Sequence, residues 1–68
     1  MLANTHMYGS LPILLHSKVF FLAGGTTVVG VVQGFEAVEG LIFVILKVDG
    51  KKSPVRLPRD SVHLVTQQ

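Results

Sequence analysis

The chain has 68 residues, no cysteine and a formal net charge of +2 at pH 7. A chain of this length forms at most one domain, and such a domain is only marginally stable because its core buries a small fraction of its surface. The missing cysteines exclude disulfides and thiolate metal sites, and the three histidines lack ligand spacing, so we expect no metal and no other cofactor. Association between copies is the source of stability that remains.

Apolar residues make up 49% of the chain and charged residues 15%, which is an apolar composition for a small domain. The longest unbroken apolar run, residues 41–46, is far shorter than the roughly 20 residues of a membrane-spanning helix. The N-terminus has no basic stretch followed by a long apolar segment, so we expect no secretory signal, no membrane partner and a cytoplasmic location. The excess apolar surface is then expected to be buried between copies of the chain.

The N-terminal part is expected to contain a tail, a short helix and a strand. Residues 1–9 show no periodicity and predict a flexible tail before a single domain over 10–68. Ser10 can cap a short helix that reaches about Ser17, with leucines on one face. A strand over 18–22 follows, because this segment is rich in β-branched and aromatic residues.

The second strand is expected to be long and bent, over 26–35. Gly24 and Gly25 before it supply the positive φ angles of a tight hairpin turn. Gly30 lies at its centre, where the missing β-carbon allows the sharp bend that closes a small barrel. Phe35 is then expected to plug one end of that barrel.

The third strand is expected over 41–48, after a turn over 36–40. It carries apolar residues on both faces, which predicts that both faces are covered. The remaining expected elements are a tight turn at 49–50, a fourth strand over 53–57, a short turn over 58–60 and a fifth strand over 61–66.

Residues 22–36 contain a motif with fixed spacing, formed by Leu22, Gly25, Val28, Gly30, Val32, Phe35 and Glu36. This spacing resembles the first motif of the Sm-like family, which includes the spliceosomal Sm proteins and the bacterial RNA chaperone Hfq. The resemblance extends over about 10–65, although residues 54–65 match only as two apolar strands around a short turn. It implies an all-β, SH3-like open five-stranded barrel with a short N-terminal helix. It also implies a homo-oligomeric ring of about five to seven subunits.

In Sm-like rings two turns line the pore and hold single-stranded RNA, and the resemblance carries this role to particular residues. The RNA-binding candidates are Glu36, Val38, Glu39 and Gly40 in the first turn, Arg59 and Asp60 in the second, and Lys18 near the ring face that Hfq uses for uridine-rich RNA. The family's base-reading asparagine is absent, and neither turn has an aromatic residue that could stack on a base. The implied binding is therefore weak, salt-sensitive and poorly selective between bases.

No catalytic motif is present, so we do not expect an enzyme. Five of the six basic residues lie beyond residue 46, which indicates either an ordinary solvated hairpin or a weak anion-binding rim. Two functions stay open: a ring that binds single-stranded RNA, and a ring-forming structural or protein-interaction module without an RNA site. An unrelated SH3-like barrel that forms no ring is a third interpretation of the same strands.

Overall fold

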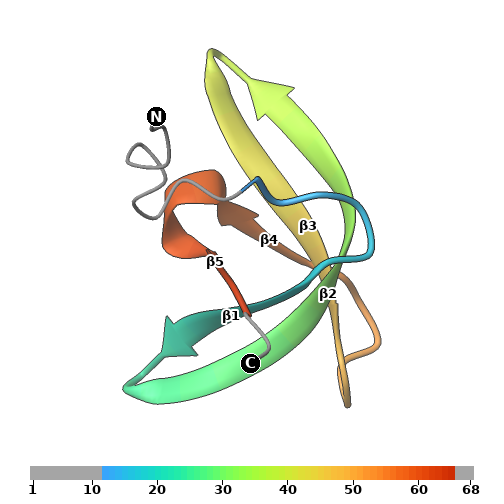
Figure 1. Cartoon of the computed structure of the whole chain (residues 1–68), viewed down its shortest axis with the longest axis vertical. Helices are drawn as coiled ribbons and strands as arrows, with labels where there is room; N and C mark the ends of the chain where they lie inside the picture. The colour runs from blue at the N-terminus through green and yellow to red at the C-terminus, as the bar shows by residue number, and fades with distance from the viewer. Residues whose placement is uncertain (1–11, 66–68) are drawn as a thin grey trace, which may run out of the picture.

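The computed structural model of the chain describes residues 12–65 and shows the expected all-β fold (Figure 1). Five strands form one antiparallel sheet in the order β4-β3-β2-β1-β5. The elements are β1 (Lys18–Ala23), β2 (Thr26–Val38), β3 (Leu41–Val48), β4 (Val55–Pro58), the 3-10 helix η2 (Arg59–Ser61) and β5 (His63–Leu64).

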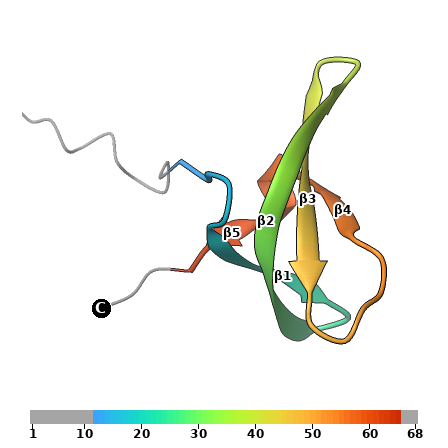
Figure 2. The same ribbon diagram turned by 90° about the vertical axis from the view of Figure 1, so that its right-hand side faces the viewer.

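The sheet is open and strongly curled. In a flat sheet the edge strands β4 and β5 would lie four strand spacings apart, about 19 Å. The link between them consists of η2 and Val62, and a 3-10 turn with extended flanks spans only about 13 Å. The short link therefore draws the two edges toward each other, and the sheet turns round on itself (Figures 1 and 2).

Strand β2 carries most of the bend. A register shift against β3 leaves Gln33 as a bulge, which increases the local twist. At Gly30 the backbone of β2 lies directly against β3. An added β-carbon there would lie 3.1 Å from the Lys47 carbonyl oxygen and 3.1 Å from Val48 Cγ2. A β-carbon at Gly30 would thus be in tight contact with β3, which agrees with the expectation that the bend needs a residue without one.

The hydrophobic core lies inside the curl. Alternate residues of β1, β2 and β3 point inward, as the two-residue period of a strand requires. The buried side chains are Ile13, Val19, Phe21, Val32, Val44, Leu46, Val48 and Val62. Among residues 12–65 no polar or charged side chain is buried, so the core is entirely apolar.

The helix expected over 10–17 is not seen. Its first residues lie outside the described chain, and residues 12–17 have no regular secondary structure apart from one turn. His16 in that turn has a left-handed φ of 71°. Its N–H donates to the Val32 carbonyl oxygen at 2.9 Å, and the Val32 N–H donates to the Ser17 carbonyl oxygen at 3.0 Å. Pairing with β2 satisfies these groups, whereas a helix of one or two turns has little stability of its own.

Strand boundaries follow the expectations with local differences. β3 begins and ends where expected, and β2 continues three residues further than expected. The turn between them is therefore confined to Glu39 and Gly40, whose φ angles of 50° and 83° are typical of a tight hairpin turn. The fifth strand is reduced to two residues because η2 extends to Ser61. The expected tail over 1–9 lies outside the described residues.

The hairpin of β2 and β3 extends beyond the core, at the top of Figure 1. Phe35 pairs with the buried Val44 and shares its inner face. Its side chain is nevertheless 43% exposed, so the expectation that Phe35 plugs the barrel is wrong. Leu41 and Ile42 at the start of β3 are exposed as well, so within residues 12–65 this end of the strand is uncovered.

Replacing Gly30 by valine should lower the free energy of unfolding by about 3 kcal/mol, the upper end of the cost of overpacking. Gly34→Val is the matched control on the same strand, because a β-carbon there would meet only Ile45 Cδ1, at 3.9 Å. The control should change stability by less than about 1 kcal/mol. Urea denaturation followed by circular dichroism measures both variants, and equal losses would contradict a special close approach at Gly30.

Candidate functional site

Three of the predicted site residues line one hollow between the β2–β3 turn and η2. Gly40 belongs to the turn, whereas Arg59 and Asp60 begin η2. The rest of the lining is apolar and consists of Leu41, Ile42, Phe43 and Pro58. The two predicted turns, far apart in the sequence, therefore face the same open hollow, which we call the η2 hollow.

Pro58 determines where this hollow begins. It pairs with Phe43 as the last residue of β4, so the first two residues of β3 have no strand beside them on that side. Proline lacks the N–H that a further ladder bond would need, which favours the end of the strand. The chain then turns into η2, and Val62 after it is buried in the core. This anchor holds η2 against the edge of β3.

The charges of the η2 hollow largely offset each other. Arg59 is half-buried and Asp60 is exposed, and the two residues are neighbours in the same turn. A carboxylate beside the single cation weakens the attraction for a phosphate. The hollow therefore offers one guanidinium group against an apolar wall, with little net charge.

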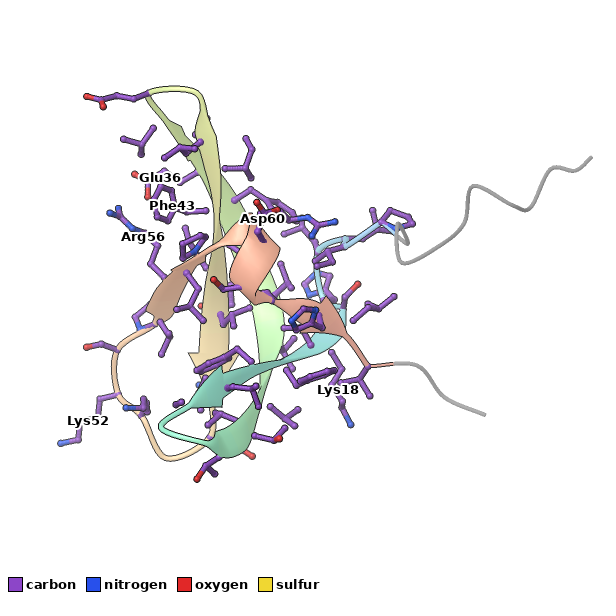
Figure 3. The ribbon with its side chains drawn as sticks, turned by 90° about the vertical axis from the view of Figure 1, so that its left-hand side faces the viewer. Lys18, Glu36, Phe43, Lys52, Arg56 and Asp60 are labelled. Atoms are coloured by element: carbon purple, nitrogen blue, oxygen red, sulfur yellow. The ribbon has the colours of Figure 1, made fainter. Side chains whose placement is uncertain are left out.

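Glu36 does not contribute to the η2 hollow. Its Oε1 accepts a hydrogen bond from Arg56 Nη1 at 2.7 Å, forming an ion pair between β2 and β4. The Arg56 guanidinium carbon also lies 5.0 Å from the centre of the Phe43 ring, a cation–π contact across β3. Figure 3 shows these three side chains grouped together, with Asp60 apart from them.

This cluster was missed by the sequence analysis, although a signal for it exists. Glu36 and Phe43 pair directly across the hairpin. Counting residues back along β2 and forward along β3 from the turn at Glu39 and Gly40 places Glu36 opposite Phe43. Arg56 could not be added in the same way, because its place opposite Ile45 depends on the loop between β3 and β4.

The other predicted residues lie around or away from the η2 hollow. Val38 ends β2 half-buried, and Glu39 is exposed at the hairpin tip next to Gly40. Lys18 begins β1 at a distant part of the sheet, as its position relative to Asp60 in Figure 3 shows. The structure therefore brings Gly40, Arg59 and Asp60 together and separates Glu36 and Lys18 from them.

Comparisons of the chain with protein-family models, with curated proteins and with solved structures found no match. Over residues 12–65 no group of three or more histidine, aspartate or glutamate side chains is placed to hold a metal ion. In that same part of the chain, no helix is long and apolar enough to cross a membrane.

Glu36→Gln should lower the free energy of unfolding by less than about 1 kcal/mol, because both partners of its ion pair are substantially exposed. The loss should shrink further at about 1 M salt, where screening is strong. Glu39→Gln removes the same charge from the exposed hairpin tip and should show no such salt-dependent loss. Thermal unfolding at low and high salt measures both, and a loss well above 1 kcal/mol would contradict a surface ion pair.

Proposed function

We propose that the chain is an Sm-like, ring-forming protein that binds single-stranded RNA without catalysis. The observation that carries this proposal is the η2 hollow. Gly40, Arg59 and Asp60 come from the two turns to which the resemblance gives RNA contacts, and they line the same depression. In a ring this depression would be repeated once in every subunit.

Ring assembly is supported by the two open edges of the sheet. Within residues 12–65, β4 pairs only with β3, and β5 pairs only with β1. Each edge strand therefore presents backbone N–H and C=O groups without a strand partner, which can pair with a second copy. Large apolar side chains are also exposed within residues 12–65, namely Leu14, Leu15, Leu22, Val29, Val31, Phe35, Leu41 and Ile42. A closed ring would pair the edges and cover part of this surface.

RNA binding at the η2 hollow is supported by its mixed chemistry. Arg59 supplies a cation for the phosphate backbone, and the apolar wall supplies a surface for bases. Phe43 of β3 also lines the hollow, but its ring is in contact with the Arg56 guanidinium, so the other apolar residues provide this surface. Because Asp60 offsets Arg59, each contact is weak, and affinity arises when several subunits hold one strand together.

The second candidate is a ring-forming structural or protein-interaction module without an RNA site. The same hollow favours it in one respect, since four of its seven lining residues are apolar and its two charges are opposite. Such a surface also suits an apolar protein segment. RNA titration of the native assembly separates the two functions.

The native assembly should contain about five to seven copies of the chain. Light scattering at micromolar concentration measures its mass, first alone and then with oligo-U or oligo-A. The oligonucleotides should add mass without changing the number of subunits. A stable monomer would contradict the ring, because it would show that the chain is stable with its sheet edges and apolar side chains exposed to water.

Arg59→Ala should lower the affinity for oligo-U and for oligo-A by similar factors, about fivefold or more. It should also make the slope of log affinity against log salt concentration shallower by about one unit, the loss of one phosphate contact. Arg56→Ala is the matched control, since it removes the same charge from a guanidinium that already pairs with Glu36. The control should change affinity by less than about twofold. Fluorescence anisotropy at several salt concentrations measures both variants.

Two outcomes would count against the proposed RNA site. Undiminished affinity in an Arg59→Ala protein that still assembles would remove the η2 hollow from RNA binding. No binding by the wild-type assembly at low salt would favour the module without an RNA site.

A further inference from the structure

A second hollow lies where the bulge of β2, the end of β3 and the β3–β4 loop meet. It has a volume of about 90 Å³ and is lined by Gln33, Lys47, Lys51, Lys52, Ser53 and Pro54. Five of these six side chains carry hydrogen-bond donors, and none is a carboxylate. We call this site the lysine hollow.

The fold brings these donors together from three segments. The bulge at Gln33 interrupts the regular alternation of β2 and redirects its side chain. Lys47 is exposed near the end of β3. Lys51 follows the tight turn, where its N–H donates to the Val48 carbonyl oxygen at 3.1 Å. Lys52 extends from the loop into solvent in Figure 3, so its flexible stem can move toward a bound anion.

The lysine hollow concentrates the positive charge of the chain. It holds three of the six basic residues, whereas the chain as a whole has four acidic ones. The one ion pair within residues 12–65 joins Arg56 and Glu36. In this part of the chain none of the three lysines is therefore paired with a carboxylate. Like charges gathered in one place repel each other, and a bound anion would relieve that repulsion.

We infer that the lysine hollow binds phosphate groups. Each ammonium group offers three donors and attracts phosphate as a compact point charge. The Gln33 amide and the Ser53 hydroxyl can donate further hydrogen bonds to the phosphate oxygens. None of the described residues that line the hollow is aromatic and able to stack on a base, so the site recognises the phosphate and not a nucleobase.

Two sources share this phosphate chemistry: the backbone of a single-stranded nucleic acid and free inorganic polyphosphate. The inference does not depend on RNA binding at the η2 hollow. The two sources are separated by titrating the full ¹⁵N-labelled chain with inorganic tripolyphosphate and, in a second series, with oligo-U. The amide signals of Gln33, Lys47 and the loop over 51–53 should shift most.

The test variant replaces Lys51 and Lys52 by glutamine and should weaken binding at least about tenfold. Lys51→Arg with Lys52→Arg keeps the charge and should retain binding within about threefold. Thr26→Glu with Thr27→Glu is the charge control, because both residues are exposed at the start of β2 and change the net charge equally. This control should weaken binding by less than about threefold, as expected for a distant charge.

Each result supports or overturns the inference. Lysine-dependent binding of tripolyphosphate alone supports the lysine hollow with free polyphosphate as its ligand, and RNA binding at the η2 hollow is then decided by the Arg59→Ala titration. Lysine-dependent binding of oligo-U supports the nucleic-acid backbone as the ligand. The inference is overturned if the wild-type chain binds neither, if the shifts spread over the whole surface, or if the charge control loses as much affinity as the glutamine variant.

Discussion

The short link from β4 through η2 to β5 is the constraint on which the rest of the structure depends. It is shorter than the width of a flat five-stranded sheet, so the sheet must curl to bring its two edges near each other. The curl forces β2 to bend, and the bend presses the backbone at Gly30 against β3. The same link sets η2 beside the β2–β3 hairpin. The apolar core and the η2 hollow are thus consequences of one covalent connection.

The division between core and surface explains where binding chemistry can exist. Every buried side chain among residues 12–65 is apolar, so the polar side chains of this part of the chain lie at its surface. β3 begins at the η2 hollow and ends at the lysine hollow. Their nearest lining residues on this strand, Phe43 and Lys47, are four residues apart, which is about 13 Å along a strand. A small ligand in one hollow can leave the other free.

Sequence reasoning succeeded where the signal is local. The run of apolar residues and the Asp49-Gly50 turn predict the bounds of β3 correctly, and the position of Gly30 within a long strand predicts the close approach to β3. The helix prediction failed because Ser17 and its neighbour bond to β2, a contact that the spacing of leucines cannot reveal. The cluster at Arg56 and the lysine hollow also depend on cross-strand register and loop path, which no local pattern specifies.

The two-residue strand β5 has a consequence for the order of folding. It meets β1 through two residue pairs, and the Val65 N–H adds one bond to the Lys18 carbonyl oxygen at 2.9 Å. These contacts join opposite ends of the described chain, whereas the hairpins of β1–β2 and β2–β3 close short loops. Long loops cost more entropy to close, so the hairpins form early and β5 docks late. With so few bonds, β5 is also the first strand to leave the sheet in local opening, and its amide hydrogens exchange with solvent before those at the centre of β2.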